Sequence, residues 1–189
     1  MGTIKDLKYK VVKNFLTSEE QLLLSTFTQI RHRHNTSAFC PFNNNGDTGY
    51  YGDAIMESLL VEKQKKMEEY TGLKLYPTYS YWRLYTYGSN LLKHKDRHSC
   101  EISVSVCIDN DGTKWPIFIE GTAINLEPGD AVIYLGCELK HWREDFTGDW
   151  QSQVFLHYVD QEGDYADLKL DKREMLAGPP GVEIEINEH

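Results

Sequence analysis

The 189-residue chain lacks the features that would direct it into a membrane, along a secretory route or onto nucleic acid. No apolar run approaches the roughly 20 residues that a membrane-spanning helix needs, and the N-terminus has no signal-peptide core. The 20 Lys and Arg residues are outnumbered by 29 Asp and Glu residues, and a net charge of −9 opposes binding to a phosphate backbone. We therefore expect a cytoplasmic protein without a membrane or nucleic-acid partner, whose oligomeric state stays open.

Cysteine is also sparse and is not arranged for metal or redox chemistry. None of the four cysteines forms a C-x-x-C pair, so neither a zinc knot nor a thioredoxin-like motif is supported. We expect reduced thiols with structural roles, because no secretion signal is seen. The length and the 40% hydrophobic content fit one domain over residues 1–189.

Residues 1–75 are predicted to form a helical N-terminal support. The capping-box pattern Thr17-Ser-Glu-Glu20 predicts a helix from Ser18 to about Arg31. Asp53 can cap a second helix, which Gly72 would end. The stretch from Cys40 to Gly52 is dense in Asn, Gly and Asp, which predicts a surface loop, with Asn43 to Gly52 as a candidate lid.

Residues 76–159 hold short β-rich runs separated by turn residues, a pattern that predicts a sandwich or jelly roll. The predicted strands are Tyr76 to Tyr87, Cys100 to Ile108, Pro116 to Ile119, Thr122 to Leu126, Asp130 to Tyr134 and Gln151 to Val159. Residues 160–189 form an acidic C-terminal tail in which a short helix is expected near Asp167 to Met175. The alternation from Val182 to Ile186 fits either an added edge strand or a loose terminus.

His94-Lys-Asp96 is the main candidate for chemistry. Residues two apart on a strand project to the same side, so His94 and Asp96 can reach one ion. A third ligand is expected from His141, in a strand that opens with Glu127-Pro-Gly-Asp130. Two imidazoles and one carboxylate hold non-heme Fe(II) while leaving coordination positions open. By spacing alone, a solvent-exposed His-Asp pair at a strand end is the alternative, because seven histidines make chance matches common.

The motifs around these residues resemble the Fe(II)- and 2-oxoglutarate-dependent dioxygenases, in particular their prolyl 4-hydroxylase-like branch. The resemblance covers roughly Val11 to Asp160. In the family's order, Arg83-Leu-Tyr85 with Gly88 leads into His94-Lys-Asp96, and Leu126-Glu-Pro-Gly-Asp130 leads into His141. Pro77-Thr-Tyr-Ser-Tyr81 and Gln153-Val-Phe-Leu-His-Tyr158 are similar to an uncharacterised bacterial and phage subgroup that has no settled substrate.

The resemblance implies a mainly β fold with flanking helices, namely a cupin-like double-stranded β-helix of the jelly-roll type. It also implies that His94, Asp96 and His141 are catalytic residues that bind Fe(II), with 2-oxoglutarate and O2 as co-substrates. The expected reaction is hydroxylation of an unidentified substrate, either a prolyl or other peptide side chain or a small metabolite.

One departure from the family pattern concerns the far carboxylate of 2-oxoglutarate. The family commonly anchors it with Arg or Lys nine or ten positions after the distal His, where this chain has Trp150 and Gln151. A buried carboxylate needs a charged or multiply hydrogen-bonding partner. Arg83 is the first candidate, because it shares a strand face with Tyr85, whose position matches a co-substrate-binding Tyr of the family; Arg143 is the second.

Two other functions fit the same residues. A cupin-like metal-dependent isomerase or hydrolase would use the three ligands without O2. A non-catalytic jelly-roll binding module would use the His-Asp pair only to support a loop. Gln153 and His157, on the strand face of Gln151, are either polar pocket groups or hydrogen-bonded barrel residues.

Overall fold

Two antiparallel β-sheets packed against each other make up most of the computed structural model, which describes residues 2–34 and 46–178. The large sheet has the order β1-β8-β5-β10-β3-β2 and the small sheet the order β4-β9-β6-β7. The large sheet contains β1 (Tyr9–Val12), β2 (Thr48–Tyr51), β3 (Leu75–Thr86), β5 (Ile102–Asn110), β8 (Ala131–Tyr134) and β10 (Trp150–Asp160); the small sheet contains β4 (Leu91–His94), β6 (Ile117–Ile119), β7 (Thr122–Ile124) and β9 (His141–Arg143). The jelly-roll prediction is therefore confirmed.

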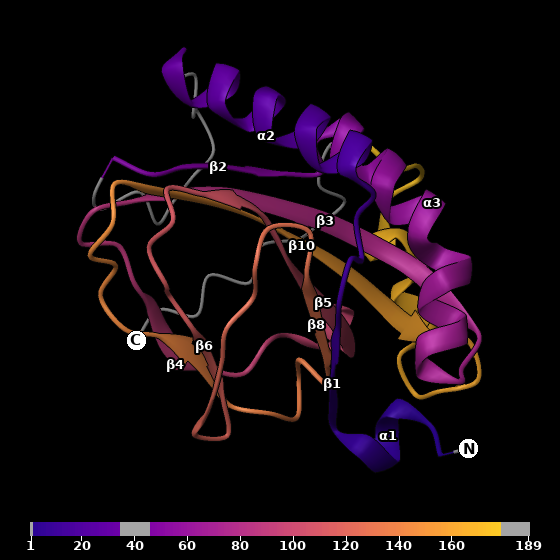
Figure 1. The fold of residues 1–189 in the computed structure, drawn as a ribbon. Coiled ribbons are helices and arrows are strands. Elements are labelled where there is room, and N and C mark those ends of the chain that lie inside the picture. The colour runs from indigo at the N-terminus through magenta and orange to yellow at the C-terminus, as the bar shows by residue number, and fades with distance from the viewer. Residues whose placement is uncertain (1, 35–45, 179–189) are drawn as a thin grey trace, which may run out of the picture.

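Two long helices cover the face of the large sheet that points away from the small sheet (Figure 1). Helix α2 (Ser18–Arg33) begins with the predicted capping box, in which the side chains of Thr17 and Glu20 bond each other's backbone N–H groups. Helix α3 (Ala54–Thr71) is capped by Asp53 at its N-terminus and by Gly72 at its C-terminus, where a φ of 72° suits a residue without a Cβ. Both predicted helices are confirmed. A short helix, α1 (Ile4–Leu7), precedes β1 and was not predicted.

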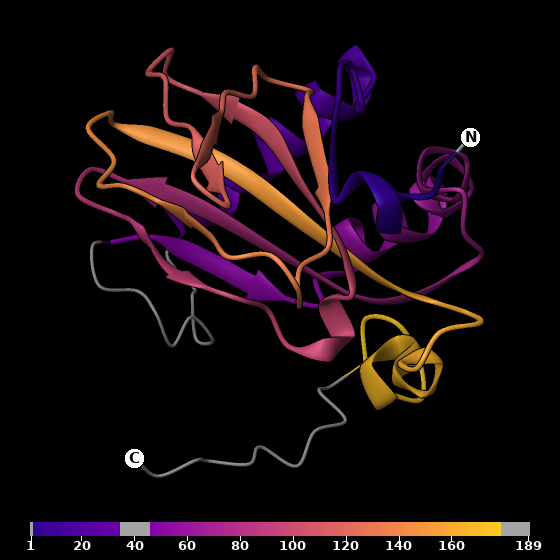
Figure 2. The same ribbon diagram turned by 90° about the horizontal axis from the view of Figure 1, so that it is seen from below.

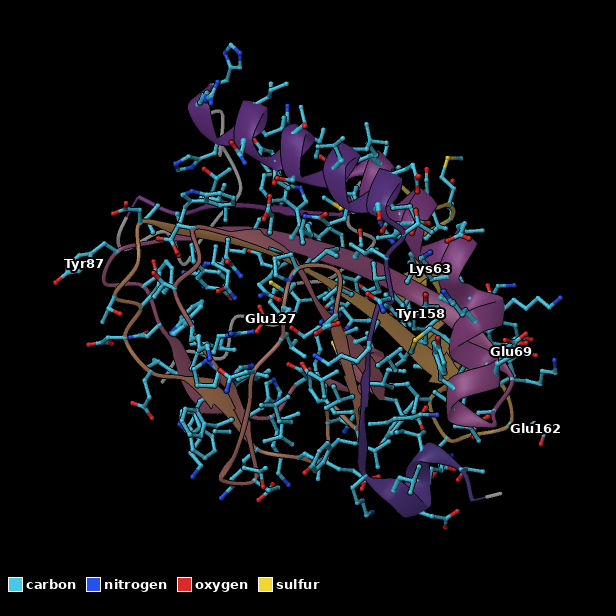
Figure 3. All side chains as sticks on the ribbon, viewed as in Figure 1. Lys63, Glu69, Tyr87, Glu127, Tyr158 and Glu162 are labelled. Atoms are coloured by element: carbon cyan, nitrogen blue, oxygen red, sulfur yellow. The ribbon has the colours of Figure 1, made fainter. Side chains whose placement is uncertain are left out.

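Strand alternation sorts the side chains of the large sheet into an outer apolar face and an inner, largely polar face. On the outer face, buried side chains such as Trp82, Val154 and Leu156 pack under the helices. Tyr158 points toward α3, where its hydroxyl donates to the carbonyl oxygen of Leu60 at 2.7 Å (Figure 3). The intervening residues point toward the small sheet, and they supply the candidate site.

Residues 46–52 do not form the loop predicted from their composition. Thr48–Tyr51 is strand β2, an edge strand paired with β3, and Tyr50 stacks on Trp82 with ring centroids 5.3 Å apart. Backbone pairing and aromatic contact therefore override the turn preference of the glycine and aspartate residues. Residues 40–45 of the predicted loop, and so part of the candidate lid, lie outside the described residues.

The described part of the tail after β10, residues 161–178, folds back on the molecule. A 3₁₀ segment, η2 (Ala166–Lys172), lies beside the short 3₁₀ turn η1 (His98–Cys100) that follows the His94 motif (Figure 2). Asp171 of η2 forms a bidentate ion pair with Arg97 at 2.7 Å for both contacts. The alternating segment from Val182 to Ile186 lies outside the described residues. No helix in the described part of the chain combines the length and apolar character that a membrane span requires.

Candidate active site

His94, Asp96 and His141 come together where β4 and β9 pair. His94 ends β4, His141 opens β9, and the two are register partners. One ligand atom from each of the three residues lies within 4.8 Å of the others. The sequence analysis was wrong on two details. Asp96 lies two residues beyond the end of β4 and not on the strand with His94. His141 does not continue the strand that follows Asp130, because the chain turns after β8 and starts β9 anew. That turn brings His141 opposite His94.

Both imidazoles are oriented by backbone carbonyl groups. His94 Nδ1 lies 2.6 Å from the carbonyl oxygen of Leu92, and His141 Nδ1 lies 3.0 Å from that of Leu139. Because a carbonyl oxygen only accepts, each Nδ1 carries the proton in the neutral ring, and each Nε2 keeps its lone pair. This arrangement of the outer hydrogen bond is typical of metal-ligating histidines.

The two Nε2 atoms face the same oxygen of Asp96. Asp96 Oδ1 lies 3.3 Å from His94 Nε2 and 3.4 Å from His141 Nε2. Burial opposes ionisation of Asp96, but hydrogen bonds from His141 and His94 hold its pKa well below the usual range. The hydrogen bond to Asp96 in turn raises the pKa of His94. In the metal-free protein the Nε2 atoms donate protons to Asp96. Once these protons are released, two nitrogen lone pairs and one anionic oxygen converge, and a divalent cation can take the place of the protons.

A second group of possible ligands shares Asp96 with the first but is less suited to a metal. It consists of Asp96, Cys100 and His157. Cys100 is buried, and burial raises the pKa of its thiol well above the usual value. Its sulfur lies 3.0 Å from the hydroxyl of Tyr79. A protonated, hydrogen-bonded thiol is a poor ligand.

Arg143 is a buried guanidinium group with unused donors. It lies two residues after His141, is 2% exposed and stacks on Trp115, with its guanidinium carbon 4.7 Å from the ring centroid. Nη1 donates to the carbonyl oxygen of Trp115 at 2.5 Å, whereas Nε and Nη2 have no hydrogen-bond partner among the described residues. Burial lowers the pKa of Arg143. Such a group needs an anion.

Arg83, unlike Arg143, has a charge partner among the residues that the structure describes. Its Nε donates to Asp47 Oδ2 at 2.8 Å, and its Nη2 lies 2.5 Å from the same oxygen. Asp47 is fully buried. The guanidinium of Arg83 also lies 4.4 Å from the ring centroid of Tyr85, which is itself buried with its pKa raised by burial. Sequence reasoning missed Asp47, because it lies within the stretch predicted to be a loop.

Gln153 supplies another unused donor on the inner face of the large sheet. Its Oε1 accepts from the hydroxyl of Ser105 at 3.3 Å, and its Nε2 is buried without a partner among the described residues. Gln153 is a register partner of Cys107, whose thiol pKa is raised by burial, an effect that the charge of Arg143 partly offsets. The inner face therefore presents N–H donors from both sheets, which suits a carboxylate.

Solved structures share this fold at low sequence identity. A prolyl 4-hydroxylase from Pseudomonas putida aligns with a TM-score of 0.62 and 17% identity, covering 84% of this chain and 97% of its own. A collagen prolyl hydroxylase of Paramecium Bursaria Chlorella virus-1, solved with 2-oxoglutarate, aligns with a TM-score of 0.60 and 11% identity, covering 80% and 94%. The alpha-ketoglutarate-dependent epimerase SnoN of nogalamycin biosynthesis aligns with a TM-score of 0.67 and 13% identity, covering 81% and 78%.

No family model matches the sequence, and no curated protein matches it either. At identities of 11–17%, the structural likeness establishes the fold, which is the predicted double-stranded β-helix. Because one fold can host many functions, the function depends on the residues of the site.

Proposed function

We propose that this chain is an Fe(II)- and 2-oxoglutarate-dependent oxygenase that hydroxylates a substrate not yet identified. The observation that carries the proposal is the convergence of His94 Nε2 and His141 Nε2 on one oxygen of the ionised Asp96. Three protein ligands on one side of an ion leave the remaining coordination positions open for co-substrates. Structural neighbours of the same fold include 2-oxoglutarate-dependent enzymes, which agrees with this assignment.

Arg143 is the proposed anchor for the far carboxylate of 2-oxoglutarate. It lies on the strand that carries His141, and its Nε and Nη2 are buried without a hydrogen-bond partner in the described part of the chain. We place it ahead of Arg83, whose guanidinium already pairs with Asp47. Gln153 Nε2 adds a neutral donor from the opposite sheet. Tyr85, in ring contact with Trp115 at 4.8 Å, is assigned to the wall of the same pocket.

The protein residues have three tasks in this proposal: to bind, to orient and to exclude water. When bound, iron and 2-oxoglutarate supply the oxidising chemistry with O2, one oxygen atom of which enters succinate and the other the substrate. Burial of His141 and Arg143 keeps the inner end of the site dry, and there an anion gains most from a charged donor. The backbone carbonyls of Leu92 and Leu139 fix the imidazole rings before the metal arrives.

Anaerobic optical titration tests the proposal. We expect Fe(II) followed by 2-oxoglutarate to produce the weak visible charge-transfer band of the chelate, and we expect His94→Ala to abolish it. Arg143→Met should keep metal binding but lose the band. Arg83→Met combined with Asp47→Asn is the matched control, because it removes the other guanidinium together with its buried partner and should retain the band.

The other outcomes identify the rival functions. Metal binding without the band, together with turnover under nitrogen, would indicate an isomerase or hydrolase that uses the same ligands. Failure to bind any divalent metal would indicate a binding module, in which His94 and Asp96 only support a loop.

A further inference from the structure

The second oxygen of Asp96 is held by a group that is not a metal ligand. While Oδ1 faces the two imidazoles, Oδ2 lies 3.2 Å from the hydroxyl oxygen of Ser103 on β5. A carboxylate that binds a metal carries no proton, so this oxygen can only accept, and Ser103 is the donor.

Counting protons identifies the role of His157. The hydroxyl oxygen of Ser103 has two other neighbours, the carbonyl oxygen of Cys100 at 3.2 Å and His157 Nδ1 at 2.9 Å. A serine hydroxyl has one proton, and both the carboxylate and the carbonyl need it. His157 Nδ1 must therefore carry its own proton and donate to the Ser103 oxygen. The hydrogen bonds then run in one direction, from His157 to Ser103 and from Ser103 to Asp96.

Packing fixes this relay in place. Ser103 and His157 are register partners on β5 and β10, and both are buried. The His157 ring lies against Tyr79, with centroids 4.5 Å apart. Gly136 packs closely against Asp96 and Ser103, because a Cβ there would lie 2.5 Å from both Asp96 Oδ2 and the Ser103 hydroxyl oxygen. Gly136 also accepts a backbone hydrogen bond from Asp96 at 3.0 Å.

We propose that Ser103 and His157 are positioning residues that act through Asp96. By occupying Oδ2, they make the carboxylate present one oxygen to the metal instead of two, which keeps a coordination position free. This inference rests on the proposed metal site, but not on the identity of the co-substrate or substrate. Partners of ligating carboxylates typically contribute about 10- to 100-fold to metal affinity.

Metal affinity without co-substrate provides the readout. The probe is Mn(II), whose free-ion EPR signal disappears on binding. We expect Ser103→Ala to weaken Mn(II) binding by about 10- to 100-fold. Ser105→Ala is the matched control: it is a buried serine on the same strand and face, but its hydroxyl bonds Gln153 and not Asp96, so Mn(II) affinity should be unchanged.

Two substitutions at His157 separate the hydrogen bond from the packing. His157→Phe keeps a ring against Tyr79 but removes the donor, so it should weaken Mn(II) binding. His157→Asn keeps an N–H near the position of Nδ1 and should restore most of the affinity. Combined with Ser103→Ala, His157→Phe should add little further loss, because both changes break the same chain of bonds.

Several outcomes would overturn the inference. Unchanged Mn(II) affinity in Ser103→Ala would do so, as would an equal loss in Ser105→Ala or equal losses in His157→Phe and His157→Asn. Thermal melting of each variant without metal shows whether its fold is intact. If His94→Ala also leaves Mn(II) binding unchanged, the proposed metal site itself fails. If His94→Ala abolishes binding while Ser103→Ala has no effect, only the relay fails.

Discussion

The two faces of the large sheet are built from the same strands but serve different purposes. On the outer face, Trp82, Leu84 and Leu156 are buried among apolar neighbours under the helices. On the inner face, the intervening positions carry Arg83, Gln153 and other buried polar groups. Each strand thus contributes to the hydrophobic core with one set of side chains and to the candidate site with the other. Side chains that stabilise the fold therefore alternate along each strand with side chains that line the candidate site.

The two faces differ in charge more than in how completely their buried donors are hydrogen-bonded. Both faces contain buried donors without a partner among the described residues: Ser80 Oγ and Trp82 Nε1 on the outer face, and Gln153 Nε2 on the inner face. On the small sheet, opposite the inner face, Arg143 adds a charged group whose Nε and Nη2 also lack a partner among the described residues. A buried charge without a partner costs far more than a neutral donor, which is the reason for proposing Arg143 as the carboxylate anchor.

The largest effect on stability is expected on the outer face. Leu156→Ala removes a fully buried side chain from the core and should lower the free energy of unfolding by about 2–5 kcal/mol. Denaturant unfolding without metal measures the loss. Mn(II) affinity of the folded variant should stay close to wild type, because the side chain points away from the site. A large loss of metal affinity with little loss of stability would contradict the separation of the two faces.

The sequence predicts the outer face and its helices better than it predicts the contacts of the inner face. The helices from Ser18 and from Asp53 were predicted because their caps are local signals, and so were most strands of the large sheet. Strand β2 was missed, since its pairing with β3 outweighs its own composition. The His94 and Asp96 motif could be found in the sequence. The Arg83 pair with Asp47 could not, nor could the Arg143 donors that lack a partner among the described residues, because both depend on contacts distant in sequence.

Ser103 and Gly136 were also missed as parts of the site. Alternation along β5 would have placed Ser103 on the inner face with Ser105, but it could not distinguish which serine meets Asp96. Gly136 carries no periodic signal, and only its close approach to Asp96 explains why the position suits a glycine.

Acid is expected to destabilise the protein through the inner face. Burial lowers the pKa of His157 to about 4, below the ordinary value of 6.5. Between these values His157 is protonated in the unfolded chain but neutral in the folded chain. The free energy of unfolding therefore decreases as the pH falls from about 6.5 to about 4. His157 alone accounts for about 3 kcal/mol of that loss.

His157→Asn tests this assignment, because asparagine does not titrate in this range. Urea unfolding of the metal-free variant between pH 7 and pH 4.5 should show a shallower loss of stability than wild type. Equal pH dependence in the two proteins would mean that other groups dominate the acid response.

Arg143→Met is expected to stabilise the metal-free protein and to abolish the binding of 2-oxoglutarate. The substitution removes a buried guanidinium with two donor atoms that have no partner in residues 2–34 and 46–178, and each unsatisfied buried group costs about 1–3 kcal/mol. Thermal or denaturant unfolding should therefore show a gain, whereas 2-oxoglutarate no longer produces the charge-transfer band. A loss of stability instead would show that the contact with Trp115 outweighs the cost of the buried charge.

The smallest effects are expected from substitutions at two adjacent residues of β10. One side chain lies on each face of the large sheet, so the two variants compare the faces directly. Gln153→Leu removes one neutral donor, so 2-oxoglutarate affinity should fall by up to about tenfold, the equivalent of one hydrogen bond. The free energy of unfolding should change by less than about 1 kcal/mol, since an unsatisfied amide is lost along with one weak bond to Ser105. Val154→Ala, one position away on the outer face, should do the reverse: it lowers stability by about 1–2 kcal/mol and leaves 2-oxoglutarate affinity unchanged. If both variants altered the same property, the two faces would be coupled through the strand, and the division of labour between neighbouring residues would not hold.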